Sequence, residues 1–367
     1  MKPFVIAEIG VNHNGSLEIA KKLIFAAFLA GANAVKFQTF KTKYVVSKNA
    51  NLAKYQKKKS SVKNQHDLIK DLELKQSDFI ELKNYCDAIS IEFISTPFDE
   101  ESLKFLVEEL NVKKIKLSSC DLNNVSLLWH AASYKIPLII SSGMSSLDEI
   151  EIALSIIIHA RLNIKFPKNL EECLLNLENY NENKKYLSDV IILHCTTAYP
   201  CPIEYVNLNA MRIIKDKFNL QIGYSDHSNG KEVCAAATAL GAVVIEKHIT
   251  LSKKLQGPDH QASMEPKDFK EMINSIRKTY SALGIFEKKI NAAEKENCKI
   301  AKRSVYAKKD ISKGKFIEFE DLIALRPENE KAIPASRLFD AIGKIAKANL
   351  KEGQYLPLEL IDKDNCL

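Results

Sequence analysis

Short apolar runs alternate with helical patterns along the first 282 residues, and no other feature of the sequence constrains the fold as strongly. The runs are nearly continuous in apolar residues, as strands buried in a parallel sheet are. Eight such runs occur, at Phe4–Ile9, Ala34–Phe40, Glu92–Thr96, Lys114–Leu117, Leu138–Ser141, Val190–Cys195, Gln221–Tyr224 and Val243–His248. Helical patterns follow most of them, at Leu17–Ala30, Glu100–Leu110, Leu147–Ala160, Asn207–Lys217, Glu232–Leu240 and Pro266–Ala282. This alternation predicts an α/β fold, a (β/α)8 or TIM barrel. A doubly wound open sheet is the alternative, but it seldom needs eight such regular units.

The chain divides into segments of different character. Residues 1–282 form the predicted barrel domain, residues 283–302 a polar linker rich in Lys and Glu, and residues 303–367 a small β-rich domain. A domain of about sixty residues is near the lower size limit for independent folding, so we expect this tail to lean on the barrel or on a partner subunit. Two long polar excursions interrupt the barrel, at 41–74 and 161–188. We interpret the first as contributing to a lid and the second as a surface insertion.

Composition excludes several classes of protein. No apolar stretch is long enough to span a membrane, and Glu8 interrupts the first apolar run too early for a signal peptide. The eight cysteines show no paired spacing, which favours free thiols in a reducing cytoplasm. The formal net charge of +7 is compatible with a phosphorylated substrate, and no aromatic–basic stripe or nucleic-acid motif is present. We therefore expect a cytoplasmic protein that binds neither membrane nor nucleic acid.

Two histidines stand at the ends of the seventh and eighth predicted strands. Tyr-Ser-Asp-His ends at His227, and Val-Val-Ile-Glu-Lys-His ends at His248. If these strands are parallel neighbours, both imidazoles lie at one end of the sheet, where two neutral imidazoles suit a catalytic divalent ion. Taken singly, each is better explained as a hydrogen-bonded structural histidine. Their pairing favours the metal site.

Polar or titratable side chains stand at the carboxyl ends of all eight predicted strands, where barrels of this type carry their chemistry. Any one Ser or Thr is explained as a structural cap, but eight converging ends predict a binding site. Lys36 and Lys116, with nearby hydroxyls, suit a phosphate and carboxylate cradle; a Schiff-base lysine is the alternative. Glu8 lies within an otherwise apolar strand, where a carboxylate is costly without a role, so it is the acid/base candidate.

The same residues carry a resemblance to the sialic acid synthase family. The motifs that carry it are Ile-Ala-Glu-Ile-Gly-Val-Asn-His-Asn-Gly (6–15), Val-Lys-Phe-Gln-Thr (35–39), Ser-Thr-Pro-Phe (95–98), Ser-Ser-Gly-Met (141–144), Leu-His-Cys-Thr-Thr-Ala-Tyr-Pro (193–200), Gly-Tyr-Ser-Asp-His (223–227), Ile-Glu-Lys-His-Ile-Thr (245–250) and Gly-Pro-Asp-His (257–260). The tail, Arg303–Leu360, resembles the family's antifreeze-like (SAF) domain. The resemblance covers nearly the whole chain.

The resemblance implies an activity and a set of site residues. The family condenses phosphoenolpyruvate with an open-chain N-acylated amino sugar and water, giving a nine-carbon nonulosonic acid and phosphate by C–O cleavage. By resemblance, His227 and His248 hold a divalent metal, Mn²⁺ or Mg²⁺, and Glu8 manages protons and water at C2 of phosphoenolpyruvate. The positions that match the phosphoenolpyruvate site are Lys36, Gln38, Thr96, Lys116, Ser119, Ser142 and Ser225. Tyr199 and Asp259 match positions near the sugar and the metal, and Arg326 matches an arginine that reaches an acyl group from the other subunit of a domain-swapped homodimer.

Within the family, residues 51–56, 196–199 and 258–260 resemble the legionaminate synthases most. The expected acceptor is then 2,4-diacetamido-2,4,6-trideoxymannose and the product N,N'-diacetyllegionaminate; N-acetylneuraminate synthesis from N-acetylmannosamine and pseudaminate synthesis are the alternatives. The chain departs from the family twice. Ser119-Cys120-Asp121 stands where Ser-Gly-Glu is usual, so the sugar contact expected of Asp121 comes from a shorter carboxylate, and residues 328–331 replace a glycine-containing turn after Arg326.

Two other classes of function remain open on the residues alone. A barrel that binds free pyruvate through a Schiff base would be an aldolase, and borohydride trapping of a lysine adduct distinguishes it. In a non-enzymatic alternative the tail binds ice or carbohydrate, but its lysines and acids make no flat, Thr-rich face.

Overall fold

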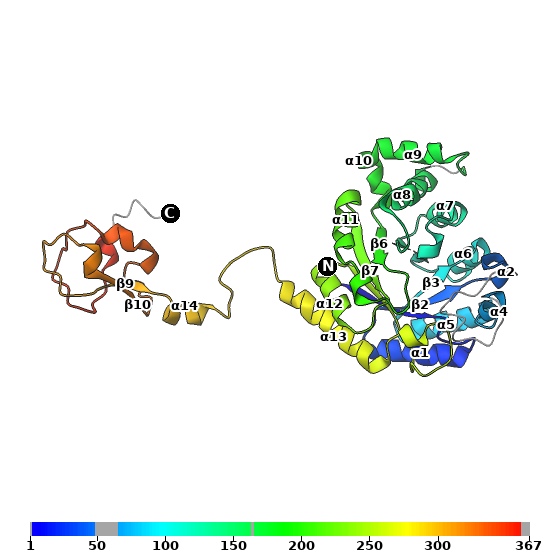
Figure 1. The fold of residues 1–367 in the computed structure, drawn as a ribbon, viewed down its shortest axis with the longest axis horizontal. Helices are drawn as coiled ribbons and strands as arrows, with labels where there is room; N and C mark the ends of the chain where they lie inside the picture. Colours follow the sequence, from blue (N-terminus) through cyan, green and yellow to red (C-terminus); the bar gives the residue numbers. More distant parts are fainter. Residues whose placement is uncertain (1, 48–64, 163–164, 361–367) are drawn as a thin grey trace. The chain divides into compact units, whose positions relative to one another are not determined.

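The chain forms two compact units in a computed structural model that describes residues 2–47, 65–162 and 165–360. The first unit spans Met1–Gly284 and the second Ile285–Leu367 (Figure 1). No helix within those described ranges is both long and apolar enough to cross a membrane.

The first unit is built on one sheet of eight parallel strands. The strands are β1 (Phe4–Gly10), β2 (Ala34–Thr39), β3 (Glu92–Pro97), β4 (Ile115–Leu117), β5 (Leu138–Ser141), β6 (Val190–Cys195), β7 (Gln221–Asp226) and β8 (Val244–His248). They are hydrogen-bonded in the order β3-β2-β1-β8-β7-β6-β5-β4, and the two end strands, β3 and β4, also pack against each other. The sheet therefore curls into a nearly closed barrel, which confirms the predicted TIM-barrel fold.

Helices surround the barrel and bury their apolar faces against it (Figure 1). They are α1 (Leu17–Ala30), α5 (Gln76–Ala88), α6 (Glu100–Lys104) with the π-helical turn η1 (Phe105–Glu109), α7 (Val125–Ser133), α8 (Leu147–Leu162), α11 (Asn209–Phe218), α12 (Glu232–Ala239) and α13 (Pro266–Leu283). Local chemistry sets their ends. In α1, the Ser16 hydroxyl accepts from the Ile19 amide, and Gly31 ends the helix in the left-handed conformation, at φ 89°.

Side chains alternate between the two faces of each strand. Below the mouth, the barrel interior is filled by an apolar layer, whose buried members are Ile6, Ala34, Ile94, Ile139, Leu193 and Val244. Two residues further along the same strands, the inward positions become polar. Position 223 in this layer requires glycine, because a Cβ there would come within 2.4 Å of Leu193 Cδ2 and 2.6 Å of Val244 O. The apolar layer thus forms a floor beneath the polar strand ends.

On the outward face of β7 and β8, a buried ion pair joins the two strands. Asp226 and Lys247 are register partners, and Lys247 Nζ lies 2.5 Å from Asp226 Oδ2. Lys247 also donates to Ser228 O at 2.6 Å. The carboxylate accepts further hydrogen bonds from the Ser228 amide and hydroxyl, the Tyr224 hydroxyl and the Cys234 thiol. The pair therefore fixes β7 and β8, which end at the two histidines, relative to each other.

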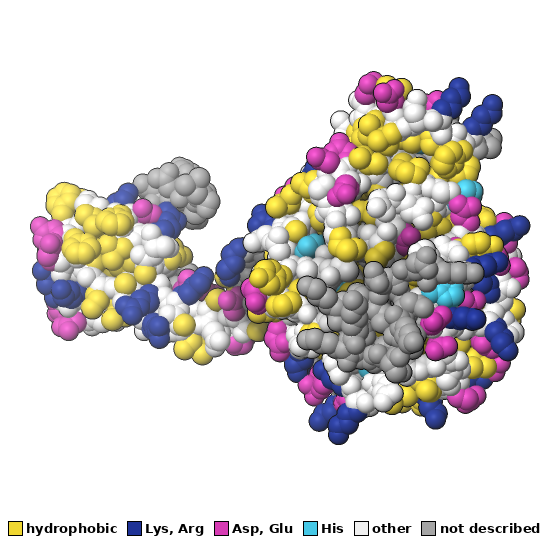
Figure 2. Space-filling view, turned by 45° about the vertical axis from the view of Figure 1, so that its right-hand side comes forward, with side chains coloured by type: hydrophobic (Ala, Val, Ile, Leu, Met, Phe, Trp, Pro, Cys, Tyr) yellow, Lys and Arg dark blue, Asp and Glu magenta, His cyan; other side chains and the backbone are white. Residues whose placement is uncertain are grey.

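The two excursions from the barrel pattern are structured where the chain is described. In the first excursion, the short helices α2 (Thr42–Val45) and α4 (Gln65–Lys70) lie on either side of residues 48–64, which are outside the described residues. The second excursion holds α9 (Leu170–Glu178), α10 (Tyr180–Asn183) and the 3-10 turn η3 (Lys184–Leu187). Cys173 and Leu187 are buried against the first unit's core, and hydrophobic side chains gather on the surface over these helices (Figure 2). The surface insertion is thus a packed helical element.

The second unit has its own small core and one antiparallel pair of strands, β9 (Ser304–Ala307) and β10 (Leu322–Leu325). A short helix, α14 (Lys295–Ala301), lies in the part of this unit that was predicted as linker and precedes the two strands. Asp321 is buried and accepts from Lys315 at 2.7 and 2.8 Å, while Lys309 pairs with it at 2.9 Å. These hydrogen bonds hold the pKa of Asp321 below its usual range although burial alone would raise it. Here a buried charge is fully paired, which is typical of a structural role.

Candidate active site

Two connected cavities open at the carboxyl ends of the barrel strands. We call them the inner chamber and the outer chamber. The inner chamber is lined by strand-end and loop side chains, namely Glu8, Lys36, Gln38, Thr96, Phe98, Lys116, Ser118, Ser119, Cys120, Ser141, Cys195, Thr197, Tyr199, Ser225, His227, Glu246 and His248. The outer chamber is lined by Val11, Gln38, Phe40, Val45, Ile69, Leu72, Phe98, Ser118, Cys120, Thr197, Tyr199, His248, Pro258 and Asp259. The predicted convergence of strand ends therefore occurs.

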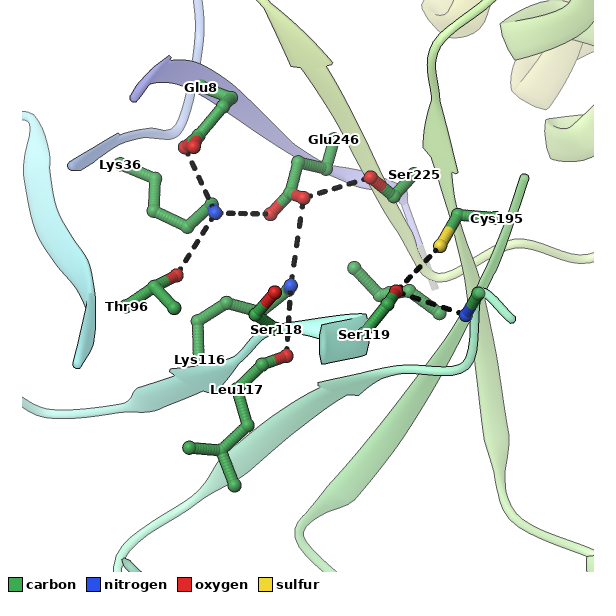
Figure 3. A network of polar contacts seen from close by, with 12 residues as sticks. Glu8, Lys36, Thr96, Lys116, Leu117, Ser118, Ser119, Cys195, Ser225 and Glu246 are labelled. Carbon is green, nitrogen blue, oxygen red and sulfur yellow. Dashed lines mark hydrogen bonds and ion pairs between the residues drawn. The ribbon is translucent and has the colours of Figure 1, made fainter. Parts of the chain in front are cut away.

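Two carboxylates and two lysines form the buried base of the inner chamber (Figure 3). Lys36 Nζ lies 3.0 Å from Glu8 Oε2 and 3.5 Å from Glu246 Oε2, and it donates to Thr96 Oγ1 at 3.1 Å. Lys116 Nζ lies 3.7 Å from Glu246 Oε1. The strand register explains the contacts, because Glu8 pairs with Lys36 across β1 and β2. Two cationic amines beside a cavity suit a phosphate or carboxylate ligand.

The two carboxyl groups have different environments and therefore different pKa values. Burial raises the pKa of Glu8 to about 7, a rise that Lys36 only partly offsets. Burial also opposes ionisation of Glu246, but Lys116, Lys36 and the Ser225 hydroxyl, which donates at 2.9 Å, together lower its pKa to about 2. Titratable groups whose pKa values are pushed apart are typical of acid/base sites. Glu8 is the group that can exchange a proton near neutral pH.

The two histidines lie beside this cluster. Their ring centroids are 5.7 Å apart, and Tyr199 stacks 4.2 Å from the His227 ring. The His227 Nδ1–H donates to Thr196 O at 2.8 Å, which leaves Nε2 as the lone-pair nitrogen. Burial lowers the pKa of both imidazoles, and for His248 the positive charges of neighbouring groups lower it further. Both rings are therefore neutral at neutral pH.

The ring nitrogens of these two histidines are suitable donors for a divalent metal ion. His248 Nδ1 is buried, has no hydrogen-bond partner in the described segments, and lies 4.0 Å from Asp259 Oδ2. Neutral imidazole is the commonest protein ligand of metal ions, and a carboxylate such as that of Asp259 suits Mn²⁺ or Mg²⁺. Within the described part of the chain, no group of three or more His, Cys, Asp or Glu side chains is arranged to hold an ion. An ion at the two histidines would therefore need further ligands from substrate or water.

Most of the other predicted site residues line one of the two chambers. Gln38, Thr96, Ser119, Tyr199 and Ser225 line the inner chamber, and Asp259 lines the outer chamber. The Gln38 amide donates to Glu8 Oε1 at 3.3 Å. The Ser119 hydroxyl accepts from the Gly143 amide at 3.0 Å.

Three predicted site residues are placed differently. Ser142 donates to Leu193 O at 3.1 Å, and its neighbour Ser141 lines the inner chamber instead. Asp121 follows the chamber-lining Cys120; burial raises its pKa to about 6. Arg326 is exposed on the second unit, directly after β10.

Sequence reasoning missed some of the residues that build the site. Glu246 was placed at a strand end but given no role, although it lies two positions before His248 and so shares its face. The apolar lining of the outer chamber was also missed, because it comes from residues scattered between positions 11 and 98. No local sequence pattern joins those positions.

The fold and the site together define a class: a (β/α)8-barrel enzyme whose mouth combines an anion cradle, an acid/base carboxyl group and a histidine pair. Comparison with known proteins supplies the family. A sequence model of the NeuB family matches residues 23–288, and one of the SAF domain matches residues 302–361. The chain therefore belongs to the NeuB family, within the sialic acid synthases, and carries a C-terminal SAF domain.

Individual relatives match almost the whole chain. The N,N'-diacetyllegionaminic acid synthase of Legionella pneumophila is 41% identical over 99% of this chain and 95% of its own length. The enzyme of the same name from Campylobacter jejuni is 41% identical over 97% of this chain and 99% of its own length. A solved structure of the N-acetylneuraminic acid synthetase of Leptospira borgpetersenii, in complex with citrate, is 34% identical. It covers 81% of this chain and 90% of its own, with a TM-score of 0.67. The resemblance found in the motifs is confirmed.

Proposed function

We propose that this enzyme condenses phosphoenolpyruvate with an open-chain N-acylated amino sugar and water, giving a nonulosonic acid and phosphate. The observation that carries the proposal is the buried Glu8–Lys36–Glu246–Lys116 cluster beside two neutral histidines. It supplies positive charge for an anionic substrate and one carboxyl group able to exchange a proton. The names of the relatives support the same activity.

The chain's own residues account for the steps of this reaction. Lys36 and Lys116, with the Thr96 and Ser119 hydroxyls, would hold the phosphate and carboxylate of phosphoenolpyruvate. Carbon 3 of phosphoenolpyruvate forms the new bond to the aldehyde carbon, whose oxygen gains a proton. Water adds at carbon 2 and gives up one proton, which balances the proton gained by the aldehyde oxygen. The carbon-2 hydroxyl then loses its remaining proton to the departing phosphate, which leaves with the bridging oxygen as the carbon-2 carbonyl forms. Glu8, with its pKa near 7, is placed to exchange these protons.

The test of the activity is phosphate release that requires both substrates. Phosphoenolpyruvate labelled at the bridging oxygen should deliver the label to phosphate. Label retained in the sugar acid would contradict C–O cleavage. Borohydride should trap no lysine adduct; a trapped adduct at Lys36 or Lys116 would favour the Schiff-base aldolase instead.

His227 and His248 would hold Mn²⁺ or Mg²⁺, with Asp259 beside them. The ion would polarise the aldehyde oxygen of the sugar. We expect chelation to abolish activity and Mn²⁺ to restore it. His227→Ala and His248→Ala proteins should keep the fold yet fail at high Mn²⁺. Full activity after exhaustive metal removal would contradict this site.

The proposed acceptor is 2,4-diacetamido-2,4,6-trideoxymannose, and the product is N,N'-diacetyllegionaminate. The two relatives at 41% identity support this choice over N-acetylmannosamine. A comparison of kcat/KM for the two sugars tests it. A preference for N-acetylmannosamine would favour N-acetylneuraminate synthesis.

We also propose a domain-swapped homodimer, located in the cytoplasm, in which Arg326 of one chain reaches the partner's barrel. The second unit's small core supports the need for such a contact. Residues 285–294, if extended, would span roughly 30 Å. Inactive His227→Ala and Arg326→Ala proteins should regain activity when mixed, because one barrel of each heterodimer is complete. Subunit exchange without recovered activity would contradict the swap, and cell fractionation tests the location.

A further inference from the structure

The outer chamber differs in chemistry from the inner chamber that it joins. Its cavity has a volume of about 230 Å³. Its apolar wall comes from separate parts of the first unit and is formed by Val11, Phe40, Val45, Ile69, Leu72, Phe98 and Pro258. The rings of Phe40 and Phe98 meet edge to face, with centroids 6.4 Å apart. No Lys or Arg lines this chamber among the described residues, and its one carboxylate, Asp259, lies near His248.

The two chambers are continuous. Seven residues line both of them, which are Gln38, Phe98, Ser118, Cys120, Thr197, Tyr199 and His248. A ligand that reaches the histidine pair from the outer chamber would therefore place its far end against the apolar wall. The charged amines of the inner chamber are left for the anionic substrate.

We infer that the outer chamber is a subsite for a methyl group of the acceptor sugar. This inference rests on the proposed function and names residues that set its substrate class. Two methyl groups of a 2,4-diacetamido-6-deoxy sugar have the required chemistry: the carbon-6 methyl and the methyl of the 4-acetamido group. A hydroxyl on carbon 6 would be buried among Val11, Val45, Ile69 and Leu72 with few hydrogen-bond partners, whereas a hydroxyl in place of the 4-acetamido group would leave the apolar wall without its methyl contact. An apolar subsite of this kind discriminates by roughly tenfold or more per methyl-sized group.

Val45 and Val11 allow a test by substitution at nearly constant volume. Val45 is half-buried on α2, and Val11 follows β1. Val45→Thr places a hydroxyl in the apolar wall, which should reduce the preference for the methyl-bearing sugar about three- to tenfold. Val11→Thr, on a separate element, should act in the same direction. The KM for phosphoenolpyruvate should stay unchanged. Val125→Thr, at a valine 39% exposed on α7, is the matched control and should behave as wild type.

The measurement compares kcat/KM for paired acceptors. One pair, the 6-deoxy and 6-hydroxy forms of 2,4-diacetamidomannose, differs only at carbon 6. The other pair carries either an acetamido or a hydroxyl group at carbon 4. A reduced preference within the first pair assigns the chamber to the carbon-6 methyl group, and within the second pair to the acetamido methyl group.

The outcomes separate the inference from the proposed function. Turnover with both preferences unchanged in Val45→Thr and Val11→Thr overturns the subsite alone. An equal loss of kcat/KM for every acceptor also overturns it, because that result indicates a structural effect. If wild type releases no phosphate from phosphoenolpyruvate with any acceptor, the proposed function fails and the subsite fails with it.

Discussion

Strands β7 and β8 carry a buried ion network on each of their two faces, and the two networks are built differently. On the inward face, Glu246 has the ammonium groups of Lys36 and Lys116 at 3.5 and 3.7 Å, and its Oε2 lacks a hydrogen-bond donor among the described residues. On the outward face, Lys247 and Asp226 are in direct contact at 2.5 Å. Hydroxyl, thiol and amide donors complete the outward network.

The difference shows how to distinguish a functional buried charge from a structural one. Burial is equal in the two networks, since Glu246 and Lys247 are 4% and 2% exposed. The two networks differ in how completely their hydrogen-bonding groups are paired, because the inward network borders a cavity and contains buried oxygens without a donor among the described residues. Incomplete pairing next to a cavity, rather than burial, therefore marks the charges available to a substrate.

The largest effect is expected from the inward network. Glu8→Gln removes the group that exchanges protons but keeps the shape, so kcat should fall by at least about a hundredfold. The dissociation constant for phosphoenolpyruvate should change little. Steady-state kinetics and equilibrium binding measure the two quantities. A near-wild-type kcat would remove Glu8 from the chemistry.

The outward network should affect stability instead. Lys247→Met leaves Asp226 buried without its cation, which should lower the free energy of unfolding by about 3–5 kcal/mol. The double variant Lys247→Met/Asp226→Asn should recover part of the loss, because no unpaired charge remains. Urea denaturation measures both. The control is Lys231→Met, which breaks the exposed Lys231–Glu271 pair (2.6 Å) and should change stability little. Equal losses in Lys247→Met and Lys231→Met would contradict the comparison.

The sequence predicted the barrel strands that carry the inward network better than the helices around them. The eight strands were placed within about two residues, because buried parallel strands are continuous apolar runs. The helices α5 and α7 were missed. In α5, three of thirteen residues, Phe79, Leu82 and Cys86, are buried, so its periodicity is faint.

The alternation of side chains along a strand explains why Ser141, and not the predicted Ser142, lines the inner chamber at the end of β5. Ile139 lies in the apolar interior layer, so Ser141, two residues on, faces the same way, and Ser142 does not. That rule was available from sequence alone. The packing of the outer chamber was not, because residues near positions 11, 40 and 70 meet only through the fold.

A pH dependence of stability separates the two carboxyl groups of the inward network. The folded-state pKa of Glu8 is raised from 4.5 to about 7, so its contribution to stability is full below 4.5 and is lost as pH rises through 7. The stability of wild type relative to Glu8→Gln should therefore fall between pH 5 and pH 8, by on the order of 2 kcal/mol. Metal-free protein with chelator present is the sample for urea denaturation.

Glu246→Gln is the control for that measurement. The folded pKa of Glu246 is lowered to about 2, so its stabilisation is present above 4.5 and is lost only as pH falls through 2. The difference between wild type and Glu246→Gln should change less from pH 5 to pH 8, because Glu246 itself does not titrate there and only its contribution to the raised pKa of Glu8 is lost. The same slope for both variants would show that the two groups share one proton rather than having separate pKa values.

The smallest effect is expected at β5, where two adjacent serines repeat the comparison on the scale of single hydroxyls. The Ser141 hydroxyl borders the inner chamber and has no partner among the described residues, whereas Ser142 donates to Leu193 O at 3.1 Å. Ser141→Ala should raise the KM for phosphoenolpyruvate about three- to tenfold, the usual worth of one hydrogen bond. Ser142→Ala should leave KM unchanged and lower the free energy of unfolding by about 1 kcal/mol. The opposite pattern, with KM sensitive only to Ser142, would contradict this expectation. It would show that substrate binding rotates the end of β5 so that the Ser142 side chain faces the inner chamber. The resemblance to the family would then predict the phosphoenolpyruvate contact better than the side-chain positions in the structure do.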